Sequence, residues 1–193
     1  MALPVVPGSG IPWKVLGSML GLSASSAAVT WALQSMRGKD SAREDALVTA
    51  AGSLGALAAW EAAWWLRRRM RRASVYQAAS TAAHLLGRPL VVIGAPDGGV
   101  TSGYGCGDVT IDLSPSVCPN WKPLDITKPL PFPDASVVVF CSCVLEYVDD
   151  PCAALSEIRR VSGGEAYFVG VEPWTLTALY FPGAKQTLPA AYR

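Results

Sequence analysis

Two short apolar runs in the second half of this 193-residue chain are each followed by residues that could bind a ligand. The run Leu90–Ile93 leads into a glycine-containing loop that begins at Gly94, and the run Val109–Ile111 leads into Asp112. Glycine lets a backbone approach a ligand closely, and an acid at the tip of a second parallel strand can hold the hydroxyls of a ribose. The pattern predicts a nucleoside site with Asp112 as a ribose contact. The alternative is local, with Asp112 bonding only the turn at Ser114.

The elements that would position these residues are clearest in the stretch that follows. A buried-strand run, Val137–Cys141, precedes an amphipathic helix at Pro151–Val161, and two aspartates directly before this helix are suited to cap it. A turn at Gly163–Gly164 then leads into a second apolar strand, Ala166–Val171. A strand, a helix and a strand in this order place the two strands parallel to each other. The sequence therefore predicts an α/β fold.

Four further pieces of sequence are spaced through the same region, namely Asp125, Leu130–Asp134, Leu145–Tyr147 and Arg160–Gly164. As a spaced set they resemble the class I S-adenosylmethionine-dependent methyltransferases, and among them the methyltransferase type 11-like domain. The resemblance implies a truncated Rossmann-like sheet of about five mainly parallel strands. It also implies S-adenosylmethionine as the cofactor.

The resemblance further implies which residues contact the cofactor. Two glycines would approach its methionine part, one aspartate would hold the ribose, a second would bind the adenine amino group, and a serine would lie near the methyl donor. In that order the residues are Gly94 and Gly98, Asp112, Asp125, and Ser142. The local alternative for Asp125 is capping of the turn Ile126–Pro129. No catalytic residue and no metal site are predicted, because the single histidine, His84, has no second ligand at suitable spacing.

Several positions depart from the family pattern. Pro96 stands at the middle glycine of the loop, where it removes an N–H group, and Val92 stands where an acid is usual. Gly103, Gly105 and Gly107 disfavour the helix that would form one wall of the cofactor site. Two functions therefore stay open. One is a membrane-anchored methyltransferase, and the other is a non-catalytic structural or docking subunit of a membrane-associated or viral assembly built on the same fold.

Residues 1–72 differ in character from residues 73–193, which we predict to be the methyltransferase-like domain. The first part carries nine basic and four acidic residues, whereas the second carries seven and eleven. Two runs with little or no charge, Val15–Met36 and Ala46–Leu66, are each long enough for a bilayer core. Five arginines, the last of them Arg72, follow the second run, as is typical of the cytoplasmic side of a membrane. We therefore predict a hydrophobic helical hairpin that anchors the domain on that side.

The hairpin also has a protein-packing alternative, in which residues 15–66 contact a hydrophobic partner in a larger assembly such as a virion. No proline or glycine separates Leu66 from Leu86, so we predict that the second helix continues into the domain and ends at Gly87. The five cysteines have no repeating spacing, which predicts reduced thiols in a cytoplasmic compartment. Residues 73–193 carry no basic run, and nucleic-acid binding is not expected.

Overall fold

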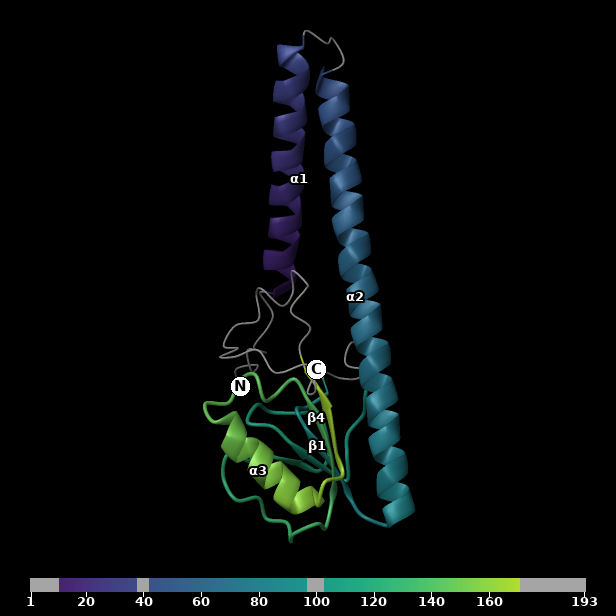
Figure 1. The fold of residues 1–193 in the computed structure, drawn as a ribbon, viewed down its shortest axis with the longest axis vertical. Helices are drawn as coiled ribbons and strands as arrows, with labels where there is room; N and C mark the ends of the chain where they lie inside the picture. The colour runs from purple at the N-terminus through teal and green to yellow at the C-terminus, as the bar shows by residue number, and fades with distance from the viewer. Residues whose placement is uncertain (1–10, 38–41, 97–102, 171–193) are drawn as a thin grey trace. The chain divides into compact units, whose positions relative to one another are not determined.

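The computed structural model describes residues 11–37, 42–96 and 103–170. An α-helical part comes first in the chain and an α/β part follows (Figure 1). The boundary between two compact units falls inside the second helix, between Leu66 and Arg67. In chain order the elements are α1 (Ile11–Met36), α2 (Ala42–Leu86), β1 (Leu90–Ile93), β2 (Val109–Ile111), β3 (Trp121–Lys122), β4 (Val138–Ser142), α3 (Pro151–Ser162) and β5 (Ala166–Val169).

Five strands form one sheet in the order β3-β2-β1-β4-β5, and every neighbouring pair is parallel. All four residues of β1 and all five residues of β4 are buried, as expected for the inner strands of a covered parallel sheet. The sheet confirms the predicted α/β fold with a truncated Rossmann-like architecture. β1 and β2 have the predicted bounds, whereas β5 ends at Val169, two residues before the predicted end.

Helices cover both faces of this sheet (Figure 1). α3 packs against one face, and the last turns of α2 pack against the other, where the Phe140 side chain is fully buried. Side chains alternate between the two faces along each strand, so β4 contributes to both apolar cores. The buried helical residues are Ala154, Ile158 and Val161 on α3 and Ala79 and Ala83 on α2.

α3 begins and ends on local signals that the sequence displays. Asp150 is its N-cap, and the carboxylate accepts a hydrogen bond from the backbone N–H of Ala153 at 2.9 Å. Pro151 occupies the first turn, where a missing N–H costs nothing. Gly163 ends the helix in the left-handed region at φ +63°, and its N–H bonds the carbonyl of Arg159. The predicted helix is confirmed with one extra residue at its end.

One arginine fastens the motif Leu130–Asp134 to α3. The Arg160 guanidinium donates to two carbonyl oxygens of this motif at 3.0 and 3.2 Å and pairs with the carboxylates of Asp134 and Glu157. Glu157 in turn accepts a hydrogen bond from the backbone N–H of Leu130 at 2.6 Å. Two of the family motifs therefore build the fold, since Arg160 of one holds the backbone of the other.

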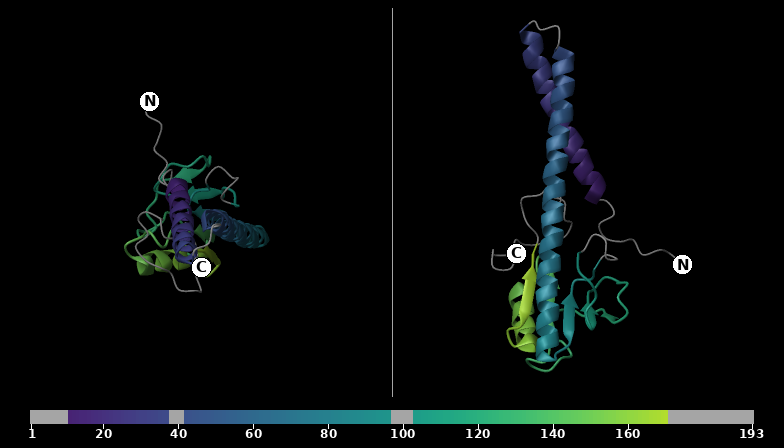
Figure 2. Two further views of the ribbon diagram at one scale, coloured as in Figure 1. Left: turned by 90° about the horizontal axis from the view of Figure 1, so that it is seen from above. Right: turned by 90° about the vertical axis from the view of Figure 1, so that its right-hand side faces the viewer.

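α2 is one continuous helix from Ala42 to Leu86, which confirms that the second hydrophobic run continues into the α/β part. Its end is also as predicted, because Gly87 adopts φ +61° and its N–H bonds the carbonyl of His84 at 3.3 Å. Within the first unit, α1 and the first part of α2 run in opposite directions (Figure 2). The Cβ positions of Gly17, Gly21 and Gly52 have nothing within 4 Å, so these glycines are not sites of close helix packing.

Among the described residues, α2 is the helix that is long and apolar enough to cross a membrane, judged by length and composition. The predicted hairpin thus contains one helix that meets this test, whereas two were expected. Large apolar side chains are exposed on both helices of the first unit. They are Leu20, Leu22, Val29, Trp31, Leu33 and Met36 on α1 and Leu47, Val48, Trp60, Trp65 and Leu66 on α2.

The prediction of reduced thiols was wrong for two of the five cysteines. Cys106 and Cys118 form a disulfide with a Cα–Cα distance of 5.7 Å. Their spacing of 12 residues gave no framework pattern, and only the fold brings the two loops together. Cys141, Cys143 and Cys152 are free thiols. Because disulfides persist in oxidising environments, the structure does not support the predicted reducing compartment.

Candidate functional site

Gly94 lies at the carboxyl end of β1 and in contact with the end of β4. Its φ is +92°, and a Cβ at this position would lie 2.5 Å from the backbone oxygen of Ser142 and 2.8 Å from a methyl carbon of Val144. Glycine is therefore required here by conformation and by packing. This requirement explains the glycine at position 94 without any ligand. The backbone of the loop nevertheless lies close to the ends of β1 and β4.

Asp112 lies directly after β2 and is held by two backbone groups. Its Oδ2 accepts a hydrogen bond from the N–H of Ala95 at 2.8 Å, and its Oδ1 accepts one from the N–H of Ser114 at 2.8 Å. The local alternative for this residue, a bond to the turn at Ser114, is thus present. Each carboxylate oxygen has a second lone pair, so two ribose hydroxyls could still donate to a carboxylate that is already oriented.

Asp125 lies in the turn after β3 and makes local contacts. Its Oδ1 accepts hydrogen bonds from the backbone N–H and the hydroxyl of Thr127 at 3.0 and 2.7 Å, and its Oδ2 is 3.7 Å from the ammonium of Lys128. The hydrogen bonds from Thr127, assisted by the charge of Lys128, lower the pKa of Asp125. The local capping role is therefore present at Asp125 as well.

A hollow of about 450 Å³ opens at the carboxyl ends of β2 and β3. Leu113, which follows Asp112 in the chain, lines it together with the segment Pro123–Asp125 and residues 128–130. The volume lies within the range of small-molecule sites. Its walls combine apolar side chains with the carboxylate of Asp125 and the side chain of Lys128, which is close to that carboxylate.

Ser142 ends β4 in contact with Gly94, and the residue is 4% exposed. Its hydroxyl oxygen has no hydrogen-bond partner in the described part of the protein. Buried polar atoms are almost always paired, so this hydroxyl marks a place where a ligand group would be stabilised. Because side chains alternate along β4, Ser142 projects to the same face of the sheet as Phe140.

One of the two thiols that flank Ser142 is buried, and the other is hydrogen-bonded within the fold. Cys141 is buried, and its burial, followed by the nearby charge of Glu146, raises the pKa of the thiol well above the ordinary value. Cys143 adopts φ +53°, and its sulfur accepts a hydrogen bond from the guanidinium of Arg72 on α2 at 3.0 Å. These contacts give both thiols a role in packing.

The fold thus brings three of the sequence-predicted contacts together, namely Gly94, Asp112 and Ser142. Gly94 contacts Ser142, and its neighbour Ala95 bonds Asp112. Asp125 lines the hollow after β3, and Gly98 lies outside the described residues. Val92, at the position where an acid is usual, is fully buried in the core under α2 and does not reach the site.

The sequence did not predict three features that hold this region, two of them single residues and one a disulfide. Tyr104 is buried, and its hydroxyl donates to the carbonyl oxygens of Gly94 and Ala95 at 3.1 and 3.4 Å. Trp121 donates from its indole N–H to the carbonyl oxygen of Asp112 at 3.0 Å. The third element is the disulfide. Tyr104 stands among glycines in a stretch with no periodic pattern, so local sequence gave no indication of its burial.

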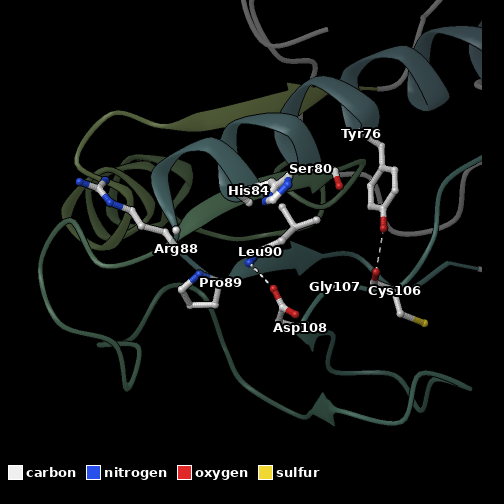
Figure 3. Close-up of a pocket in the computed structure, with 11 residues that line it drawn as sticks. Tyr76, Ser80, His84, Arg88, Pro89, Leu90, Cys106, Gly107 and Asp108 are labelled. Atoms are coloured by element: carbon white, nitrogen blue, oxygen red, sulfur yellow. Dashed lines mark hydrogen bonds between the residues drawn. The ribbon is translucent and has the colours of Figure 1, made fainter.

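A larger hollow, of about 620 Å³, lies at the opposite end of the sheet (Figure 3). Tyr76, Ser80 and His84 on α2 and Asp108 before β2 line it. Two of its polar groups are already used, since Tyr76 donates to the carbonyl of Cys106 and the carboxylate of Asp108 accepts from the N–H of Leu90, both at 2.8 Å. Open parallel sheets bind ligands at the carboxyl ends of their strands, so we place the candidate site at Asp112.

The parallel sheet and its helix-covered faces define a Rossmann-like domain, and an acid follows the carboxyl end of β2. Residues 102–169 match the family model of the methyltransferase domain. The match covers about a third of the chain and extends from the loop before β2 to the end of β5. This part of the protein is therefore a class I S-adenosylmethionine-dependent methyltransferase-like domain. No curated protein and no solved structure matches the chain.

Proposed function

We propose that the domain binds S-adenosylmethionine at the carboxyl ends of β1, β2 and β3 and serves as a membrane-attached methyltransferase. The observation that carries the proposal is the oriented carboxylate of Asp112 next to the hollow lined by Leu113 and Asp125. A carboxylate for the ribose and an apolar slot for the base are the two features that a nucleoside requires. The pairing supports the nucleoside half of the cofactor.

The residues present also fit a polar group near the end of β4. The buried hydroxyl of Ser142 would bond the methionine part, beside the backbone of Gly94. When bound, S-adenosylmethionine supplies a methyl group on a positively charged sulfur, which an acceptor nucleophile takes. The contribution of the chain would be to hold donor and acceptor in line and to exclude water, and positioning of this kind supplies much of the rate of such reactions.

Isothermal titration of the full chain in detergent with S-adenosylhomocysteine tests the proposal. Asp112→Ala should weaken binding at least tenfold, because the ribose hydroxyls lose their acceptor. Asp108→Ala is the matched control, since Asp108 precedes the same strand and also bonds a backbone N–H, but at the opposite end of the sheet. Absence of binding at millimolar ligand, or equal affinity of the Asp112→Ala variant, would overturn the proposed site.

The membrane part of the proposal rests on α2. Its apolar first part is followed by the arginines of residues 67–72, and exposed apolar side chains line both helices of the first unit. Extraction of membranes at alkaline pH without detergent should leave the protein in the pellet. Release into the supernatant would instead favour packing of residues 15–66 against a protein partner.

The orientation in the membrane has two opposing determinants. The arginines after the apolar part of α2 favour a cytoplasmic domain, whereas the Cys106–Cys118 disulfide favours an oxidising compartment. Labelling of the exposed thiol of Cys152 in intact cells with a membrane-impermeant maleimide separates the two orientations. Labelling would place the domain outside the cytoplasm, and protection until lysis would place it inside.

A second function is supported by a different observation. Three residues around the site already have polar groups bonded within the chain, namely Asp112, Asp125 and Gly94. A non-catalytic structural or docking subunit of a membrane-associated or viral assembly would need these bonds and no cofactor. Titration separates the two functions, because a docking subunit gives no heat with the nucleoside and no thermal stabilisation.

A further inference from the structure

The disulfide joins two loops on either side of β2. The first loop, residues 103–108, leads into this strand, and the second loop, residues 113–120, connects it to β3. Cys106 belongs to the first loop and Cys118 to the second. The bond therefore links the two segments between which Asp112 is held.

The first loop reaches the candidate site through Tyr104. The ring of this residue packs against Tyr76 and Phe140, with centroids 6.2 and 5.0 Å apart. Its hydroxyl bonds the carbonyl oxygens that follow β1, at Gly94 and Ala95. A second bond, from the hydroxyl of Tyr76 to the carbonyl of Cys106 at 2.8 Å, fixes this loop on α2 next to the disulfide. The first loop thus sets the position of the segment after β1.

The second loop reaches the same site through Trp121. The backbone N–H of Trp121 bonds the carbonyl of Cys118 at 3.2 Å, so the half-cystine and the start of β3 move together. The indole N–H of Trp121 then bonds the carbonyl oxygen of Asp112 at 3.0 Å. This contact fixes the backbone of Asp112 from the side opposite to the first loop.

The contacts of the two loops meet at Asp112. Its backbone carbonyl accepts a hydrogen bond from Trp121, and its carboxylate accepts one from the N–H of Ala95. We propose that the Cys106–Cys118 disulfide, acting through Tyr104 and Trp121 as positioning residues, holds Asp112 in its oriented state, so that nucleoside affinity depends on the oxidation state of this cysteine pair. The dependence of affinity rests on the proposed function. The effect on Asp112 itself does not require any ligand.

The chemical step is an ordinary thiol–disulfide exchange. An external dithiol attacks one sulfur of the pair as a thiolate, forms a mixed disulfide and then closes to its own cyclic disulfide. Two electrons and two protons are transferred to the protein, which leaves thiols at Cys106 and Cys118. Two loops that were joined covalently are then held by noncovalent contacts, among them the hydrogen bonds of Tyr104, Tyr76 and Trp121.

Hydrogen–deuterium exchange of the full chain in detergent, without ligand, tests the positioning. The amides of Ala95 and Ser114 both donate to Asp112, so their protection reports its orientation. Reduction with dithiothreitol, verified by a mass gain of about 2 Da, should raise their exchange rates at least tenfold. The amide of Val139 in β4 bonds Glu165, far from the disulfide in sequence, and should be unchanged.

Variants separate the disulfide from its positioning residues. Cys106→Ser with Cys118→Ser should reproduce the reduced protein, and Cys152→Ser, at an exposed free thiol, is the matched control with no effect. Tyr104→Phe keeps the ring contacts but removes the hydroxyl, and it should raise exchange at Ala95 about threefold with the disulfide intact. If the double variant does not fold, reduction of the wild-type protein provides the same comparison.

The outcomes distinguish this proposal from the proposed function. Unchanged exchange at Ala95 and Ser114 after complete reduction would overturn the positioning, and so would a parallel rise at Val139, which would make the disulfide a general stabiliser. If exchange rises as expected but no S-adenosylhomocysteine binds in either state, the positioning stands and the proposed function fails. If the nucleoside binds, its affinity should fall at least fivefold on reduction, and equal affinities would reject the coupling.

Discussion

The two halves of the sheet are stabilised by different means. β4, α3 and β5 form a complete strand, helix and strand unit, with a capped helix and an apolar core under it. β1 and β2 share this apolar core, but residues 103–108 before β2 form a loop. The loops of this half are held by a disulfide and by side chains that bond backbone groups. The candidate site belongs mainly to this second kind of structure.

The difference explains why the geometry of one half tolerates single substitutions and that of the other half does not. A packed helix fixes its strands by many apolar contacts, so no single residue decides their geometry. A loop held by one covalent bond and a few hydrogen bonds depends on each of them. Polar groups that would otherwise receive a ligand, such as the carboxylate of Asp112, are here also part of the loop structure.

The largest loss of stability is expected from truncating a side chain in the apolar core under α3. Ile158 is fully buried, and Ile158→Ala should lower the free energy of unfolding by about 4 kcal/mol through lost burial and a residual cavity. Urea denaturation of the full chain in detergent measures the change. Ser156→Ala, at an exposed position on the same helix, should change stability by less than about 0.5 kcal/mol. A loss below about 1 kcal/mol for Ile158→Ala would mean that α3 packing does not dominate this half.

The corresponding test of the other half removes the disulfide. A bond that closes a loop of 12 residues should contribute about 3 kcal/mol by restricting the unfolded chain, so Cys106→Ser with Cys118→Ser should lose about that amount. Denaturation under the same conditions gives the value. Wild-type protein denatured in dithiothreitol should match the variant, and equal stability of all forms would show that the loops are held without the bond.

A smaller effect is expected from pH at the ion pairs of Arg160. The hydrogen bond from Arg160, with that from the backbone of Leu130, lowers the pKa of Glu157. Because the pKa is lower in the folded state, the ionised carboxylate contributes its full stability at pH values above the ordinary carboxyl pKa of about 4.3. This contribution is lost as the pH falls through the folded-state pKa. Stability of the wild type should therefore fall in acid, and Glu157→Gln should remove about 1 kcal/mol of that dependence. An identical acid profile for the variant would show that Glu157 does not contribute.

Local sequence predicted most helices and strands of the α/β part, in both halves of the sheet. The apolar runs gave the bounds of β1 and β2, and Asp150, Pro151 and Gly163 gave the ends of α3 because capping depends on neighbours in the chain. The family motifs predicted the parallel sheet. β3 was not predicted, since two residues carry no periodicity, and its place in the sheet depends on pairing with β2.

The candidate site was predicted only in part. The sequence placed Gly94, Asp112 and Ser142 at strand ends, and parallel strands bring such ends to one edge of a sheet. It could not show that Asp112 already bonds Ala95, or that Tyr104 is buried beside Gly94. These contacts depend on how two loops fold back on the sheet. No pattern within either loop records that arrangement.

The amino-acid sequence by itself determined the bounds of β1, β2 and α3 almost to the residue, because apolar period and caps act over a few neighbouring residues. The tertiary structure alone decided that Cys106 and Cys118 are bonded, that Arg160 holds the Leu130–Asp134 motif, and that the hydroxyl of Ser142 is buried without a described partner. Each of these features depends on groups that are distant in the chain, and only the packed fold fixes the distances between such groups.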